Sequence, residues 1–481
     1  MISRPSFHFL GKLGAVLLPL LLGAPMAEAQ RPNVLFITAD DLHWDSLGAY
    51  GSPVPDITPN LDRLAAEGMR FERAHVTVAV CQPSRSVLMT GRYPHRNGAR
   101  GFEPIREDVP TLLELLHEAG YLSGILGKVD HLAPIHKFRW AMVQQVEKLG
   151  TGRDPERYGQ HVKRFIKRAQ REGRPFFLMA NAHDPHRPFA GSADEQRRFG
   201  EKLDFPEPSR TYRPEEVVVP GFLPDLPKVR EEVAQYYSSV RRLDDMVGAV
   251  LRALAESGEA GNTVVMFLSD NGMSMPFAKS NTYLNSTKTP WIVLWPGHVI
   301  PGTRDHRHYI SGIDFMPTIL EMTGVPSPEG LDGQSFLPVL KGIAQPGRNH
   351  IFTFYHASSD GRQYPMRARQ DRRFGYIYNG WADGKTRFNV ETQHGLTFAA
   401  MKRAGKQDAE IAKRVELYLY RTPEELYDLR EDPNALYNLA GDPRYREQLK
   451  SMRRAMRAWM RRTGDDLLPE YREYLDRSNR R

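Results

Sequence analysis

The sequence predicts an α/β fold with a large central sheet, mixed but mostly parallel, that is flanked by helices. Through the first two thirds of the chain, short apolar runs typical of buried strands alternate with helical patterns, which indicates a sheet covered on both faces. After about residue 345, shorter strand-like runs alternate with glycine, aspartate and arginine, and a helical tail follows. We therefore expect a main domain over residues 30–345 and a smaller C-terminal α+β domain, an antiparallel sheet plus a helix, over 346–481.

Local signals mark the individual elements. Thr58 followed by Pro59 is typical of a helix start. Thr111 and Glu114 form a capping-box pattern whose helix should stop at Gly120. The other expected elements are strands over residues 34–38, 122–126, 176–180, 264–268 and 291–294, an amphipathic helix over 233–254, strand-like runs over 351–354 and 374–378, and a C-terminal helix with apolar Leu449, Met452, Met456 and Trp459.

The composition is that of an ordinary globular protein, with 40% hydrophobic and 26% charged residues. The net charge of +8 mildly favours anionic substrates or surfaces. Several arginines lie on the C-terminal helix, where they form its solvent face, and no nucleic-acid-binding motif accompanies them. We expect no nucleic-acid partner. Because the chain has one cysteine, its stability must come from its core rather than from disulfides.

The first 29 residues are typical of an export signal. Arg4 and Lys12 precede an apolar stretch over residues 13–22, and Ala27 and Ala29 offer a small-x-small cleavage site. The stretch is short and is interrupted by Pro19, and no later segment is long and apolar enough to span a bilayer. We therefore expect an exported protein, periplasmic or extracellular, without stable membrane insertion.

Polar residues follow four of the predicted strands. Asp40 and Asp41 follow the first, Lys128 and His131 the second, His183 the third, and Asp270 with Asn271 the fourth. Ligand sites of open α/β sheets lie outside the carboxyl ends of the strands, so we expect these side chains in one crevice. The aspartates and the asparagine offer only oxygen ligands, which suit Ca²⁺ or Mg²⁺. Taken singly, each acidic motif is also typical of a helix cap or a turn.

The single cysteine, Cys81, lies in the run Cys81-Gln82-Pro83-Ser84-Arg85, and Thr90-Gly91-Arg92 follows. An isolated thiol is more often buried and inert than chemical. This run, however, resembles the signature of the sulfatase family. Further stretches that resemble the family are Thr38-Ala39-Asp40-Asp41, Gly120-Tyr121, Gly127-Lys128, His183-Asp184-Pro185-His186, Ser269-Asp270-Asn271-Gly272, Asp314 with Pro317-Thr318, and residues 425–439.

The resemblance implies a fold, a cofactor and roles for these residues. In sulfatases the signature cysteine is oxidised by a dedicated maturation enzyme to formylglycine (3-oxoalanine), whose hydrate is the nucleophile. The resemblance further implies one Ca²⁺ per chain, with the catalytic domain at residues 30–345. The implied ligands are Asp40, Asp41, modified Cys81, Asp270 and Asn271. The implied catalytic roles are orientation of the nucleophile by Arg85, charge neutralisation by Lys128 and Lys279, proton donation by His183 and proton removal by His131, with His186 and Arg187 near the substrate.

Some stretches resemble one branch of the family, the heparan N-sulfatases or sulfamidases. They are residues 270–283, 183–187, 222–225 and 364–367. Lys279 stands where sulfamidases tend to carry arginine, which keeps the charge but loses the bidentate fork. The resemblance implies release of N-sulfate from glucosamine in heparan-type saccharides. An O-sulfatase acting on a sulfated glycan or small ester, a phosphonate or phosphodiester hydrolase, and an inactive glycan-binding relative stay open as alternatives.

Overall fold

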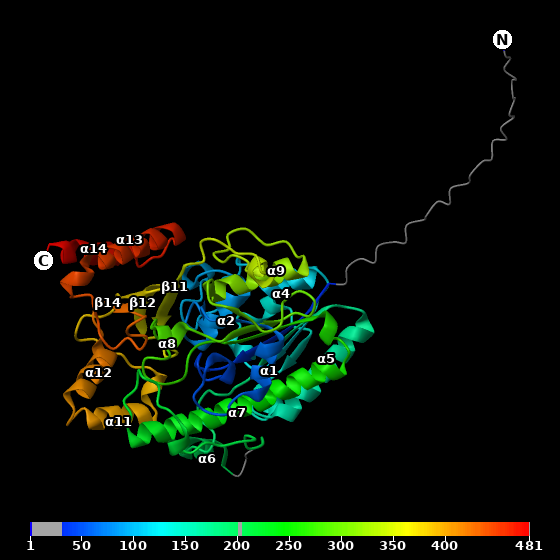
Figure 1. Cartoon of the computed structure of the whole chain (residues 1–481), viewed down its shortest axis with the longest axis horizontal. Coiled ribbons are helices and arrows are strands. Elements are labelled where there is room, and N and C mark those ends of the chain that lie inside the picture. The colour runs from blue at the N-terminus through cyan, green and yellow to red at the C-terminus, as the bar shows by residue number, and fades with distance from the viewer. Residues whose placement is uncertain (2–30, 201–203, 481) are drawn as a thin grey trace. The chain divides into compact units, whose positions relative to one another are not determined.

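A computed structural model shows how the chain folds (Figure 1). It describes Met1 and residues 31–200 and 204–480; beyond Met1, the predicted export signal lies outside the described residues. Residues Arg31–Arg481 form one compact unit. The predicted domain boundary near residue 345 stays a prediction. Among the described residues, no helix is long and apolar enough to cross a membrane.

The main sheet has eight strands in the order β5-β4-β6-β1-β7-β8-β2-β9. The strands from β5 through β7 pair in parallel, whereas β8 is antiparallel to both β7 and β2. This confirms the predicted mixed, mostly parallel sheet. The strands are β1 (Asn33–Ala39), β2 (Met69–Phe71), β4 (Leu122–Leu126), β5 (Met142–Gln144), β6 (Phe176–Asn181), β7 (Thr263–Ser269), β8 (Trp291–Leu294) and β9 (Thr303–Asp305). Each of the five predicted strands is present within one residue at either end.

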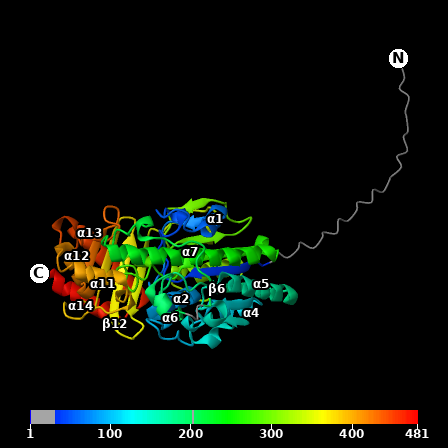
Figure 2. The ribbon, with the colours of Figure 1, turned by 90° about the horizontal axis from the view of Figure 1, so that it is seen from below.

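Helices cover both faces of this sheet, and β1 shows how. Leu35 and Ile37 pack into one core, and Val34 and Phe36 pack into another on the opposite face. The first core contains residues of α1 (Pro59–Glu67), α5 (Pro155–Glu172) and α7 (Pro227–Glu256), and the second contains residues of α4 (Leu112–Glu118) and α9 (Phe315–Thr323). Because successive strand side chains point to opposite faces, a strand apolar throughout needs both cores. Figure 2 shows α7 extending along the sheet toward the C-terminal helices.

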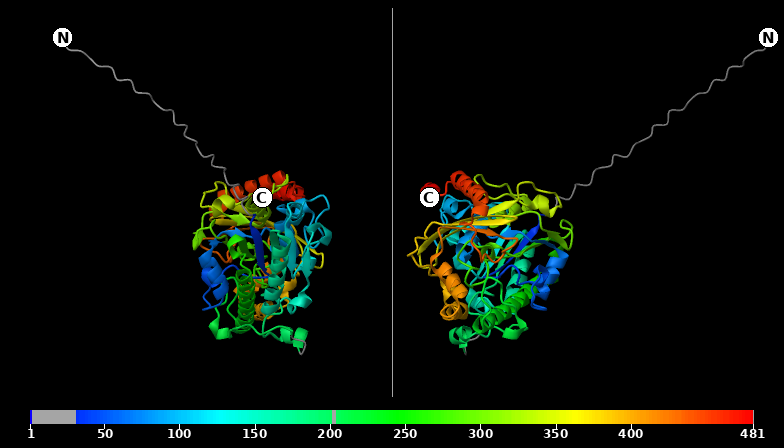
Figure 3. Two further views of the ribbon diagram at one scale, coloured as in Figure 1. Left: turned by 90° about the vertical axis from the view of Figure 1, so that its right-hand side faces the viewer. Right: turned by 60° about the vertical axis from the view of Figure 1, so that its left-hand side comes forward.

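The C-terminal part is built on a second, antiparallel sheet in the order β11-β12-β13-β14. Its strands are β11 (His350–Ala357), β12 (Gln363–Asp371), β13 (Phe374–Asn379) and β14 (Glu424–Asp428), and its helices are α11 (Leu396–Ala404), α12 (Ala409–Tyr420), α13 (Arg446–Thr463) and α14 (Leu468–Asn479). Leu449, Met452, Met456 and Trp459 are all buried on α13, as their helical spacing predicted. Figure 3 shows the red C-terminal helices beside this sheet.

The cap predictions had different outcomes. Thr111 and Glu114 form the predicted capping box at the start of α4, which ends at Glu118. Thr58 does precede α1, but its hydroxyl accepts a hydrogen bond from Gly48 and donates one to Asp62 instead of capping the helix. The remaining short elements are α2 (Cys81–Thr90), α3 (Pro94–Asn97), α6 (Ala193–Phe199), α8 (Leu284–Thr287), α10 (Leu337–Leu340), and the paired strands β3 (Ala74–His75) and β10 (Ile310–Ser311).

Candidate functional site

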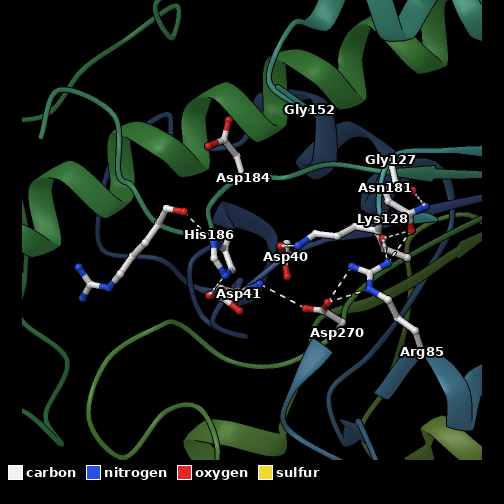
Figure 4. A network of polar contacts seen from close by, with 12 residues as sticks. Asp40, Asp41, Arg85, Gly127, Lys128, Gly152, Asn181, Asp184, His186 and Asp270 are labelled. Carbon is white, nitrogen blue, oxygen red and sulfur yellow. Dashed lines mark hydrogen bonds and ion pairs between the residues drawn. The ribbon is translucent and has the colours of Figure 1, made fainter. Parts of the chain in front are cut away.

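The polar residues that follow β1, β4, β6 and β7 lie together at the carboxyl ends of these strands (Figure 4). Asp40, Asp41 and Asp270 are fully buried, and one carboxylate oxygen from each lies within 4.8 Å of the others. β1 and β7 are adjacent and in register from Asn33 to Ala39, which brings the acidic turn after one strand against the acidic turn after the other. The backbone amide of Asp41 donates to Asp270 Oδ1 at 3.3 Å.

Two oxygens of this acidic group have no partner among the described residues. Asp40 Oδ1 and Asn271 Oδ1 are buried and accept no hydrogen bond, whereas Asp40 Oδ2 pairs with Lys128. The Asn271 amide nitrogen donates to Asp41 Oδ1 at 2.7 Å, so its oxygen is the atom left over. Buried polar atoms without partners are rare and call for an explanation. A hard divalent cation such as Ca²⁺ fits this oxygen-only donor set and would polarise an oxyanion bound beside it.

The charges of the group are strongly coupled. Burial raises the pKa of Asp270 to about 7, against the opposing effect of Arg85 and with the help of the Asp40 carboxylate. Burial also penalises ionised Asp40, but the ammonium of Lys128 outweighs it and holds the pKa of Asp40 well below its usual value. Each of the three carboxylates pairs with one protein cation, so the case for a divalent cation rests on the unpartnered oxygens rather than on a missing charge.

Cys81 is the first residue of α2 and is 6% exposed. Burial raises the pKa of its thiol to about 12. The thiolate, not the thiol, is the reactive form of cysteine. An unmodified Cys81 would therefore be a poor nucleophile at neutral pH in this setting.

Arg85 lies one turn after Cys81 and is fully buried. Its Nε and Nη2 donate to Asp270 Oδ2 at 3.1 and 2.7 Å, and its Nη1 donates to Thr38 and to Asn181 Oδ1 at 3.0 and 2.6 Å. The guanidinium thus connects the ends of β1, β6 and β7. These contacts make Arg85 a positioning residue for Asp270, and its predicted role toward the nucleophile stays a prediction.

The two predicted lysines pair with different aspartates of the acidic group. Lys128 forms an ion pair with Asp40 Oδ2. Lys279 Nζ lies 2.7 Å from Asp41 Oδ1 and 2.7 Å from Glu391 Oε1. Burial disfavours the ammonium, yet the carboxylates of Asp41 and Glu391 outweigh it and raise the pKa of Lys279 well above its ordinary value. Both lysines are placed to contact an anion that binds beside the aspartates.

Three histidines were predicted at the site: His183 and His186 follow β6, and His131 follows β4. The rings of His183 and His186 lie 5.1 Å apart, and His186 Nε2 is 3.9 Å from Asp41 Oδ2. Burial and the nearby Lys128 lower the pKa of His183 well below its usual value, and the same two causes lower that of His131 to about 3. Neutral imidazoles can accept protons, so a donor role for His183 requires that it first take one up. Asp40, His183 and His186 also have ligand atoms within 4.8 Å of one another.

Arg187, predicted to contact substrate, pairs with a residue of α7. Its guanidinium pairs with Glu232 of α7 and donates to the Ser274 carbonyl at 3.2 and 2.9 Å. It also stacks over Phe189, with 4.5 Å between the guanidinium carbon and the ring centre. These contacts hold the loop after β6 against α7, and the substrate role of Arg187 stays a prediction.

Two groups at the site were not anticipated from the sequence. Asp184, beside His183, is buried between Arg153 and Arg242, and its carbonyl accepts a hydrogen bond from the Asp40 amide at 3.2 Å. Glu391 comes from the C-terminal part and reaches Lys279. The sequence around Glu391 carries no motif, whereas Asp184 stands inside a noted motif without any signal of its role.

A mostly parallel sheet with this buried acidic group and a lone cysteine opening the adjacent helix defines a hydrolase of the sulfatase class. A family model described as Sulfatase matches residues 32–325, and one described as N-sulphoglucosamine sulphohydrolase, C-terminal, matches residues 272–379. The chain belongs to the sulfatase family, and it is a hydrolase of sulfate esters or sulfamates.

Two curated relatives and one solved structure illustrate the similarity. The chain is 33% identical to human N-sulphoglucosamine sulphohydrolase over 476 residues, 93% of each chain. It is 28% identical to an ulvan-active sulfatase of Formosa agariphila, over 93% of this chain and 83% of the relative. A phosphonate monoester hydrolase of Agrobacterium radiobacter shares the fold, with a TM-score of 0.67 and 20% identity over 90% of this chain and 96% of the other.

Proposed function

We propose that this protein is an exported, Ca²⁺-dependent sulfatase that releases N-sulfate from glucosamine in heparan-type saccharides. The observation that supports N-sulfate is the 33% identity to human N-sulphoglucosamine sulphohydrolase over 93% of both chains, together with the matching C-terminal model. The buried acidic group alone would suit the hydrolysis of an O-sulfate equally well. Export rests on the N-terminal signal pattern in the sequence.

The proposed cofactors follow from the site. One Ca²⁺ would be held by Asp40, Asp41, modified Cys81, Asp270 and Asn271. The unpartnered oxygens of Asp40 and Asn271 and the closeness of the three carboxylates support it. A maturation enzyme would convert Cys81 to formylglycine, which supplies a hydrated aldehyde as nucleophile when present. The high pKa of the buried thiol supports this, because a plain cysteine there would stay protonated.

The chain's own residues would then bind and orient the sulfate. Lys128 and Lys279 would contact its oxygens, Arg85 would hold Asp270 in place, and a histidine would exchange protons with the leaving atom. His183 is the proposed donor and His131 the proposed acceptor, with His186 and Arg187 near the substrate.

The test uses purified, matured protein with N-sulfated, 2-O-sulfated and 6-O-sulfated saccharides and an aryl phosphate. Release of sulfate from the N-sulfated saccharide is expected. Release from O-sulfated saccharides alone would overturn the N-sulfate assignment, and preferential phosphate release would favour the phosphonate or phosphodiester alternative. Loss of turnover in Cys81→Ala with saccharide binding retained would separate an enzyme from a glycan-binding relative.

A further inference from the structure

A cavity of about 180 Å³ lies beside the acidic group. Val80 and Ser280 form part of its wall, and these are the sequence neighbours of Cys81 and Lys279. The C-terminal part supplies most of the rest from two segments, the turn between β11 and β12 and the segment before α11. The remaining lining residues are Phe102, Ser358, Ser359, Asp360, Asn389, Val390, Glu391 and His394.

Glu391 connects this cavity with the acidic group. Its Oε1 lies 2.7 Å from Lys279 Nζ, and its Oε2 lies 4.0 Å from His186 Nε2. Lys279 in turn contacts Asp41, so the Glu391 carboxylate is one side chain away from a proposed calcium ligand. The Glu391 side chain is 36% exposed, which leaves it surface to offer to a ligand in the cavity.

The charge of the cavity differs from that of the sulfate site. Among the described residues that line it, Asp360 and Glu391 carry charge and no lysine or arginine does. Asp360 is engaged by the Ser358 hydroxyl at 2.6 Å and by Arg362 Nε at 3.3 Å. A second sulfate would be repelled by these carboxylates, whereas hydroxyl groups or an ammonium would find acceptors.

Hydrolysis of an N-sulfate and hydrolysis of an O-sulfate leave different groups on the saccharide. Hydrolysis of an N-sulfate breaks the S–N bond and forms a new S–O bond from water: R–NH–SO₃⁻ + H₂O gives R–NH₃⁺ + SO₄²⁻. Both water protons end on the nitrogen, so the saccharide leaves as a cation. Hydrolysis of an O-sulfate places one water proton on the new hydroxyl group, which is neutral, and releases the other to solvent: R–O–SO₃⁻ + H₂O gives R–OH + SO₄²⁻ + H⁺. A nearby carboxylate therefore favours the first product over the second.

We propose that the cavity holds the saccharide ring of the leaving group and that the Glu391 carboxylate accepts a hydrogen bond from the amine of that ring. Through this contact Glu391 sets the preference for N-sulfate. This rests on the proposed function. The cavity volume is below the about 300–1,000 Å³ typical of sites for larger ligands, which suits one ring rather than a long chain. Glu391 would contact the amine while its other oxygen holds Lys279.

The kinetic test compares wild type, Glu391→Gln and Glu118→Gln as a matched control, since Glu118 is exposed at the end of α4. Values of kcat/KM are measured for N-sulfoglucosamine and for an aryl O-sulfate. We expect Glu391→Gln to lower the N-sulfate value about tenfold more than the aryl sulfate value, and Glu118→Gln to change neither. Equal loss on both substrates would mean that Glu391 only positions Lys279, and would overturn the proposal.

Calorimetry gives a readout that does not depend on turnover. Wild type should bind glucosamine more tightly than N-acetylglucosamine below the pKa of the amine, and Glu391→Gln should abolish this preference. A wild type that lacks N-sulfatase activity but shows the Glu391-dependent preference would refute the proposed function and the role in N-sulfate preference, and would support only the amine contact of Glu391. N-sulfate cleavage without the preference for glucosamine would support the proposed function and refute the role of Glu391. The absence of both the cleavage and the preference would refute the proposed function and the role of Glu391 together.

Discussion

Replacing Arg242 with methionine would break the charge cluster beneath the loop that follows β6. Arg242 lies in the middle of α7 and is 1% exposed. Its Nε donates to Asp184 Oδ2 at 2.7 Å, and its Nη2 donates to Asp184 Oδ1 at 3.1 Å and to Glu195 Oε1 at 2.9 Å. Methionine would occupy part of the space but would leave both carboxylates buried without this cation.

The cost follows from what each carboxylate retains. Removing one partner of a buried ion pair costs about 3–5 kcal/mol. Asp184 keeps Arg153 at 3.3 Å, and Glu195 keeps the Gly191 amide at 2.8 Å. We therefore expect the lower end, about 3 kcal/mol, which lowers the ratio of folded to unfolded protein about a hundredfold.

The assay is urea unfolding followed by tryptophan fluorescence, with the free energy taken from the midpoint and slope. Arg252→Met is the matched control, because Arg252 is an exposed arginine of the same helix. It should change the free energy of unfolding by less than about 0.5 kcal/mol. If Arg242→Met cost less than about 1 kcal/mol, the reasoning that this cluster stabilises the fold through charge pairing would be wrong.

Three further perturbations address stability, the cation and maturation. Burial opposes the charge of Asp465, yet buried Arg367 outweighs this effect and lowers the pKa of Asp465 to about 2. The pair should therefore stabilise the folded protein above about pH 4, and this stabilisation should be lost as the pH falls from about 4 to 2. Asp465→Asn should then cost about 2 kcal/mol at pH 7 and little below pH 2, as measured by unfolding free energy against pH. Added Ca²⁺ should raise the unfolding temperature of wild type but not of Asp40→Asn, because only the folded site binds the ion; an equal rise in both would place the ion elsewhere. Because Cys81 is 6% exposed, the maturation enzyme should convert it in the unfolded chain and not in the folded Cys81 protein, as read from the mass of the Cys81 peptide.

Much of the fold could be predicted because its signals are local. Apolar runs marked five strands of the main sheet, and the capping box at Thr111 marked the start of α4. The carboxyl-end rule also brought Asp40 and Asp270 to one place, because neighbouring parallel strands end at the same edge of the sheet. These residues are fixed by the strands themselves, and a sequence reading needs only the strands to locate them.

Other partners depend on packing between distant segments, and no local pattern specifies them. Arg187 stands in a motif next to the site, and its ion-pair partner, Glu232, comes from the distant helix α7. The contact of Asp184 with Arg242 likewise requires knowing which turn of α7 faces the loop after β6. A motif names the residue type at a position, whereas the direction of the side chain is set by whichever charge the tertiary structure brings near it.

This difference bears on where specificity is encoded. The acidic group and Lys128 lie at strand ends or immediately after them, so their geometry follows from the sheet and can serve sulfate on any leaving group. Glu391 lies instead between β13 and α11, on a segment whose position depends on how the C-terminal part packs against the main sheet. A segment of this kind can change without disturbing the sheet. The preference for one leaving group over another should therefore change with residues 380–395 while the residues at the strand ends stay the same.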